Sequence, residues 1–178
     1  EISSALGISD EPVTMCAWFK PDVLTPDESG AAVVALAPTT EGAEHRRLLR
    51  INTDGSASAQ VNDPTGGVSA TSEVGLIVVG TWYHGCAVFA SASSRTIYVN
   101  GIDRGSNTAT RNPDAPSLTR IGLLVNTSDF NGEKRFNGLI DEVSIWNRSL
   151  SSQEVLALYK RGALRLNLSV RSCDDSAC

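Results

Sequence analysis

Pairs of carboxylate side chains are the groups in this sequence that could most directly catalyse a reaction. Two carboxylates at positions i and i+2 of a strand lie on the same face, where they can share the nucleophile and acid/base roles of glycoside hydrolysis. Asp141 and Glu142 are adjacent instead, so an extended chain directs them to opposite faces, and Asp174 and Asp175 are adjacent in the same way. Neither histidine has the sequence context of a serine hydrolase. The sequence therefore predicts a protein that is not an enzyme.

The strand that contains Asp141 alternates in a regular way. Its two predicted faces are Leu139, Asp141, Val143 and Ile145 on one side, and Ile140, Glu142, Ser144 and Trp146 on the other. We expect the first face to line the core, where a buried carboxylate needs a partner. Hydrogen bonds from loop N–H groups, an arginine or a metal ion could each meet that need.

Four cysteines allow three disulfide pairings. Cys173 and Cys178 bracket a short polar loop, and pairing them leaves Cys16 with Cys86, each in a strand-like segment. We expect both bridges if the chain is secreted; the alternative is that Cys16 and Cys86 are buried free thiols. The spacing does not indicate zinc, because there is no C-x-x-C motif and His84 has no evident ligand partner in the sequence.

Aromatic residues are scarce, at 6% of the chain, so most of them should belong to the core. Trp18 and Trp146 lie in apolar strand segments and are predicted to be buried. Trp82 and Phe130 adjoin turns and are the candidates for an exposed surface that binds sugar, with Asn131 as a polar neighbour. For each of these aromatics, burial in the core remains the alternative.

Short strands separated by turns would have to position all of these side chains. The sequence predicts strands at residues 13–20, 31–36, 46–52, 56–61, 74–79, 83–90, 95–99, 102–104, 118–125 and 135–146. Asn100-Gly101 is a preferred hairpin dipeptide, and Asp54-Gly55 marks another turn. This pattern indicates an all-β fold, an antiparallel two-sheet sandwich.

One short helix is predicted near the C-terminus, over about residues 152–161. Ser151 and Glu154 form a capping box, and Leu150 and Val155 form a hydrophobic staple. Gly162 is expected to end the helix as a C′ residue. Residues 164–170 then alternate like a strand, so we expect a domain at 1–163, with 164–178 as its closing edge strand or the start of a following module.

The overall charge excludes some classes of partner. A net charge of −5 and an isoelectric point near 5.0 argue against nucleic acid. No apolar run approaches the length of a membrane span, so no membrane insertion is expected. The first residues lack the features of a signal peptide, which suggests a mature or excised piece of a larger multidomain protein or assembly.

Five segments in order resemble one family. They are the Trp-then-Lys-Pro strand at 13–21, the Trp-Tyr-His strand at 81–89, the Tyr-Val-Asn-Gly hairpin at 96–101, the Ile-Gly strand at 118–122 and the closing strand and helix start at 136–154. Together they are similar to the laminin-G-like, concanavalin A-like jelly-roll domains, in particular the bacterial laminin-G type 3 branch. One departure is that only residues 1–11 stand where a further strand is usual.

The resemblance implies a jelly roll and, in many members, a structural calcium ion held by oxygen ligands. Here Asp141, Asp10 and Glu11 are the candidate calcium ligands. Because the fold hosts enzymes as well as binding modules, the resemblance alone gives no ligand; with the carboxylate geometry of catalysis missing, we expect a non-catalytic module, extracellular or on a cell or virion surface, that recognises glycans or glycoconjugates. The alternative is a structural module of a surface layer, fibre or virion, whose partners are other extracellular proteins.

Overall fold

Two five-stranded antiparallel sheets and one two-stranded sheet form the computed structural model of this chain, which describes residues 8, 11–24, 31–38, 45–125 and 133–166. The first sheet has the order β12 (Gly138–Trp146), β1 (Val13–Pro21), β6 (Tyr83–Ser91), β7 (Ser94–Val99), β8 (Ile102–Asn107). The second has the order β5 (Gly66–Thr71), β4 (Ala57–Asp63), β3 (Arg46–Ile51), β2 (Ala31–Ala37), β9 (Leu118–Ile121). β10 (Leu123–Val125) pairs with β11 (Glu133–Arg135), and α1 (Ser152–Leu166) is the helix of the described chain.

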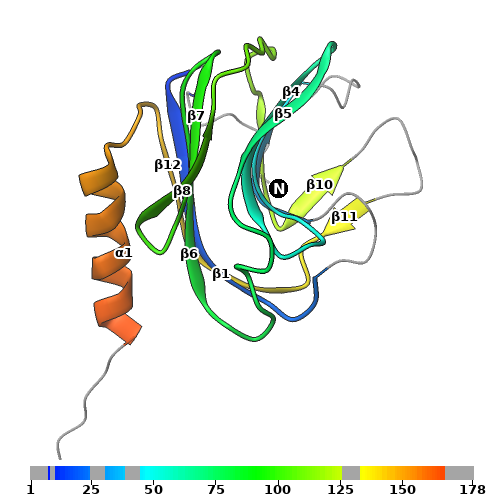
Figure 1. The fold of residues 1–178 in the computed structure, drawn as a ribbon. Coiled ribbons are helices and arrows are strands. Elements are labelled where there is room, and N and C mark those ends of the chain that lie inside the picture. The colour runs from blue at the N-terminus through cyan, green and yellow to red at the C-terminus, as the bar shows by residue number, and fades with distance from the viewer. Residues whose placement is uncertain (1–7, 9–10, 25–30, 39–44, 126–132, 167–178) are drawn as a thin grey trace, which may run out of the picture.

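Alternate residues of most strands fill the space between the two sheets. Met15 and Phe19 of β1, Phe89 of β6 and Leu49 of β3 are among the fully buried side chains of this core. The predicted all-β sandwich is confirmed. Figure 1 shows α1 standing on the outer side of the first sheet, and the β10–β11 pair on the opposite side of the molecule.

The hairpin dipeptide Asn100-Gly101 joins β7 to β8 as predicted. Both residues have positive φ, 53° and 76°, as a type I′ turn requires. Gly101 is needed for a second reason, because a Cβ there would lie 3.1 Å from the Cα of Leu156 in α1. The turn therefore also gives the helix its close approach to the sheet.

The predicted facing of β12 is wrong over its first half, because the strand contains a bulge. Between the paired positions Cys16–Ser144 and Trp18–Asp141, β1 has one residue and β12 has two. Glu142 takes up the extra step with a φ of 47°. The inward face is therefore Ile140, Val143 and Ile145, while Leu139 and Asp141 are exposed.

The predicted strand at 74–79 is also wrong, because this segment is a loop. Gly75 and Gly80 both have a φ of 75°, which is incompatible with an extended strand. Ile77 is inserted into the core, and its N–H donates to the carbonyl of Gly55, 2.8 Å away. The strand that completes the sheet is β5, whose glycines and hydroxyl residues did not suggest a strand.

The helix extends further than the sequence predicts. α1 continues through Leu166, so Gly162 lies inside the helix and does not end it, and the predicted strand at 164–170 begins as helix. A Cβ at Gly162 would lie 2.2 Å from Nε1 of Trp18, so glycine is required there for close packing. Residues 167–178 are outside the described part of the chain.

Candidate functional site

The space between α1 and the first sheet is filled by a small apolar cluster. Cys16, Cys86, Val88, Tyr98, Leu150 and Val155 are its buried members. Trp146 and Leu158 are partly buried against it. This cluster lies on the outer face of the sheet, separate from the main core, and it fixes the helix in place.

A disulfide between Cys16 and Cys86 ties β1 to β6 inside this cluster. The two residues face each other in the antiparallel ladder, with their Cα atoms 4.1 Å apart. The predicted bridge is confirmed, and the alternative of buried free thiols is excluded. Cys173 and Cys178 lie outside the described residues, so their pairing stays a prediction.

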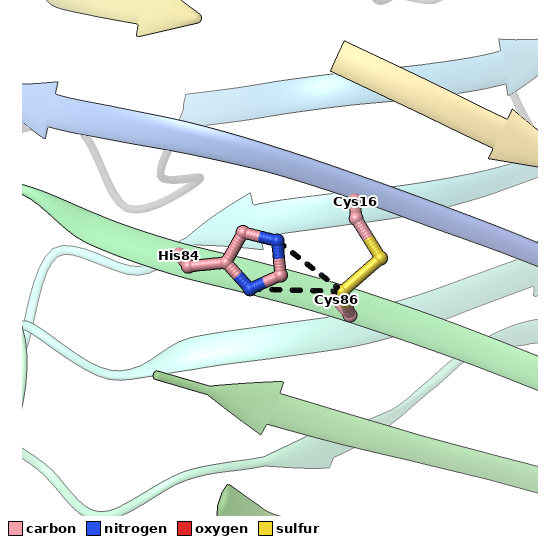
Figure 2. Close-up of side chains that lie close together, drawn as sticks. All are labelled: Cys16, His84 and Cys86. Atoms are coloured by element: carbon pink, nitrogen blue, oxygen red, sulfur yellow. Dashed lines mark hydrogen bonds between the residues drawn. A yellow bond between two sulfur atoms is a disulfide. The ribbon is translucent and has the colours of Figure 1, made fainter. Parts of the chain in front are cut away.

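His84 lies beside the disulfide, as Figure 2 shows, which the sequence did not suggest. Its ring nitrogens are 3.9 and 4.0 Å from Sγ of Cys86. The rings of Trp18 and Tyr159 approach it to 5.4 and 6.2 Å. Burial lowers the pKa of His84 to about 4, so its imidazole is neutral at neutral pH. His84 and Cys86 are two residues apart on one strand, so their side chains share a face; this spacing could have predicted their proximity.

The start of α1 is built as the sequence predicts. The main-chain N–H of Ser151 donates to Glu154, and the N–H of Glu154 donates to the Ser151 hydroxyl, at 2.8 and 3.3 Å. Leu150 and Val155, the two staple residues, are both buried. The capping box thereby fixes the direction in which α1 leaves β12.

Thr14 holds the turn between β12 and α1. Its hydroxyl donates to the carbonyl of Arg148 at 2.9 Å and accepts from the N–H of Leu150 at 3.0 Å. Thr14 is fully buried and stands opposite Trp146 in the β1–β12 ladder. The same hydroxyl therefore fixes the residues on both sides of the turn.

A pocket of about 250 Å³ opens between the end of β12 and α1, and we call it the Trp146 pocket. It is lined by Trp146, Arg148, Leu150, Glu154, Ala157, Leu158 and Arg161. The helical residues among them follow an i, i+3, i+4, i+7 row, which puts them on one side of α1. The aromatic and aliphatic residues supply apolar surface, and the three charged residues surround it.

The charged groups of the pocket are already partly organised. Arg148 Nη2 lies 2.7 Å from Oε1 of Glu154. Hydrogen bonds from Arg148 and then from Ser151 lower the pKa of Glu154 to about 2, so its carboxylate stays ionised. Arg161 is exposed and forms no ion pair within the described part of the chain. With two arginines and one glutamate, the pocket carries one more positive than negative charge.

The sequence-predicted sugar-binding residues lie elsewhere. Trp82 is partly exposed and precedes β6 directly, so it lies near the Phe19 end of β1, opposite to the Trp146 end. Phe130 and Asn131 are outside the described residues. Trp146 was assigned to the core, but it is only partly buried. The charged residues at helical spacing after Trp146 were the signal for the pocket.

The candidate calcium ligands do not form one site. Glu11 accepts from Nε of the buried Arg47 at 2.6 Å, and Asp141 is exposed and accepts from the N–H of Glu142 at 2.7 Å. Asp141 stands opposite Trp18 in the β1–β12 ladder. Trp18 is five residues, or about 17 Å, further along β1 than Val13, the first residue of the strand after Glu11. One ion with ligands at about 2.3–2.6 Å cannot bind both carboxylates. Asp10 lies outside the described residues.

Calcium binding therefore stays a prediction, and these residues do not fit it as a set. The measurement is thermal unfolding with a chelator and with millimolar calcium, because an ion that binds only the folded chain raises the midpoint.

The architecture defines a class of protein: a concanavalin A-like jelly-roll domain with one helix on its outer face. The family model described as the concanavalin A-like lectin/glucanases superfamily matches residues 2–156. The chain therefore belongs to this family, Laminin_G_3. No curated protein matches the chain in sequence.

Several solved structures share the fold. The CBM40 of a Ruminococcus gnavus IT-sialidase, bound to α2,3-sialyllactose, has a TM-score of 0.68 and 13% identity, covering 87% of this chain and 86% of that one. Domain 4 of the Geobacillus stearothermophilus arabinanase AbnA, bound to arabinotriose, has a TM-score of 0.65 and 22% identity, covering 86% of this chain and 68% of that one. A heptameric SAP-like pentraxin of Limulus polyphemus has a TM-score of 0.65 and 18% identity, covering 85% and 70%.

At these identities the similarity establishes the fold alone. Within the described residues, no helix is long and apolar enough to cross a membrane.

Proposed function

We propose that this protein is a non-catalytic extracellular module that recognises glycans, and that a sugar residue binds in the Trp146 pocket. The observation that supports this proposal is one aromatic ring and an aliphatic wall beside three charged side chains in a single hollow. Sugars present apolar C–H faces and hydroxyl edges, so they require both kinds of surface at once.

The size of the pocket limits the ligand. A volume of about 250 Å³ lies below the range of roughly 300–1,000 Å³ typical of drug-sized ligands. A single terminal sugar residue fits this limit better than a long chain segment. Two of the structural neighbours were solved with a bound oligosaccharide, sialyllactose or arabinotriose, which supports the same class of ligand.

The extracellular location is supported by the disulfide. Cys16–Cys86 is buried and joins strands 70 residues apart in sequence. Such bridges persist in oxidising compartments and are rare in the cytosol of ordinary organisms.

A glycan array, followed by titration of the best ligand, tests this proposal. Trp146→Ala should lower the affinity about tenfold or more, because it removes the aromatic face. Trp82→Ala is the matched control, since it removes a tryptophan at the other end of β1 and should leave the affinity unchanged. If the array shows no ligand, or if Trp82→Ala alone abolishes binding, the Trp146 pocket is not the site.

One observation favours the alternative, an assembly module. Val74, Val78 and Val79 are 73%, 53% and 46% exposed on one loop. The loop is fixed, because the N–H groups of Gly75 and Gly80 donate to the carbonyls of Asp54 and Pro21. Exposed apolar groups on a fixed loop suit contact with another protein. Self-association in light scattering without sugar, lost in Val78→Ser/Val79→Ser, would favour this function.

A further inference from the structure

Cys16, His84 and Cys86 form a compact cluster, shown in Figure 2. The cluster lies on the sheet face that packs against α1, where Val155 and Tyr159 contact it. Their potential ligand atoms all lie within 4.8 Å of one another. Cys16 and Cys86 are fully buried, and His84 is 5% exposed. Within the described ranges, this is the one group of three His, Cys, Asp or Glu side chains with metal-ligand geometry.

The distances are close to those of a metal site. In a tetrahedral site with Zn–N near 2.0 Å and Zn–S near 2.3 Å, nitrogen and sulfur are about 3.5 Å apart. The His84 nitrogens are 3.9 and 4.0 Å from Sγ of Cys86, so a small rotation of the ring brings either nitrogen into range. The bond between the two sulfur atoms is what prevents them from binding a metal.

We propose that reduction of the Cys16–Cys86 disulfide creates a Cys₂His site for a divalent ion of the zinc type. An external dithiol reduces the bridge: the S–S bond breaks, two thiols form, and the dithiol closes into its own disulfide. A divalent ion then displaces the two thiol protons, which are released to water. The two thiolates and the neutral imidazole supply three ligands, and a fourth position is open to water.

Charge favours a divalent ion at this place. Two thiolates, a neutral imidazole and M²⁺ have no net charge. The surroundings are apolar, with Val88, Leu150 and Val155 in the same buried cluster. A monovalent ion such as copper(I) would leave one net negative charge there, which burial disfavours. Thiolate and imidazole together also select zinc over the hard cations magnesium and calcium.

The backbone can hold Cys16, His84 and Cys86 in place both in the oxidised protein and in the reduced, metal-binding form. β1 pairs with β12 on one side and β6 on the other, and β6 also pairs with β7. Cys16 and Cys86 therefore stay opposite each other after the S–S bond breaks, and rotation of their side chains is enough to separate the sulfurs. His84 is held by its own main chain, whose N–H and carbonyl both bond to Asn100, at 2.9 and 2.7 Å.

Cobalt(II) titration of the full chain tests the proposal. The background variant is Cys173→Ser/Cys178→Ser, so that Cys16 and Cys86 supply all of the thiols. After reduction with a phosphine, which leaves no competing thiol, we expect the d–d bands of tetrahedral cobalt and a thiolate charge-transfer band, saturating at one equivalent. The oxidised protein should show neither band.

Two histidine variants identify the third ligand. His84→Gln should weaken cobalt binding at least tenfold, and His45→Gln is the matched control that should not change it. Reduced protein without the bands, or equal affinity in wild type and His84→Gln, would overturn the proposal. If reduction unfolds the chain, zinc(II) should restore the native circular dichroism in wild type and not in Cys86→Ser; failure to restore it also overturns the proposal.

Discussion

At the scale of single residues, the Thr14 hydroxyl helps to position the Trp146 pocket. It is fully buried and makes two hydrogen bonds to the turn that joins β12 to α1. Valine has almost the same shape and lacks both bonds. Thr14→Val should lower the free energy of unfolding by about 1–3 kcal/mol, because it leaves the buried N–H of Leu150 without a partner.

Chemical denaturation measures this effect. The same variant should also weaken glycan binding, since Arg148 and Leu150 line the pocket. Thr96→Val, a partly exposed threonine of β7 in the same sheet, is the comparison. Equal stability of Thr14→Val and wild type would show that the hydroxyl does not hold the turn.

The Glu154 carboxylate gives stability a defined pH dependence. Its pKa is lowered from 4.5 to about 2 in the folded chain, so the unfolded chain takes up the proton at higher pH. Its contribution to stability is therefore complete above pH 4.5 and is lost as the pH falls towards 2. Glu154→Gln should be less stable than wild type at pH 7, and the difference should narrow across this range.

Thermal unfolding midpoints of the two proteins between pH 7 and 2 test this dependence. Added salt should reduce the difference, because Arg148 and Glu154 are both exposed. A difference that does not change with pH would mean that ionisation of the Glu154 carboxylate contributes nothing measurable to stability.

At the scale of elements, Gly162 tests how α1 is docked. Helix propensity alone predicts that Gly162→Ala stabilises the protein by about 1 kcal/mol. The structure predicts the opposite sign, a loss of about 1–3 kcal/mol, because the new Cβ would meet the buried Trp18 ring at 2.2 Å. Urea denaturation distinguishes the two outcomes, and a gain in stability would contradict the packing of α1 on Trp18.

The same elements show what the sequence could predict. Alternating apolar residues, hairpin dipeptides and the capping box were sufficient for the sandwich, the Asn100-Gly101 turn and the start of α1. The face of β12 was not predictable, because a one-residue bulge reverses the alternation and its positive-φ position is occupied by Glu142, not glycine. A turn-forming glycine is expected at such a place.

The candidate site was predicted only in part for a related reason. The outer face of the first sheet looked like core, since α1 covers it and its residues are apolar. Trp146 and His84 could therefore not be told apart from interior residues until α1 was placed. The contact between helix and sheet is not visible in the sequence, whereas the Cys16–Cys86 bridge was one of three possible pairings and was expected if the chain is secreted.

At the scale of the whole molecule, two different surfaces could mediate recognition. The Trp146 pocket lies beside α1 on the outer side of the first sheet, and Trp82 lies near the other end of β1. The protein carries a net charge of −5, whereas the pocket has two arginines and one glutamate. Ligands with an acidic group should therefore favour the pocket over the rest of the surface.

The most direct test follows the three tryptophan indole N–H signals by ¹H–¹⁵N NMR while a glycan selected on the array is added. The proposed function predicts that the Trp146 signal shifts and saturates, while those of Trp18 and Trp82 stay in place. A saturating shift of Trp82 with Trp146 unchanged would contradict the assignment of the site. If no indole signal moves for any glycan, recognition of sugar in the Trp146 pocket is refuted.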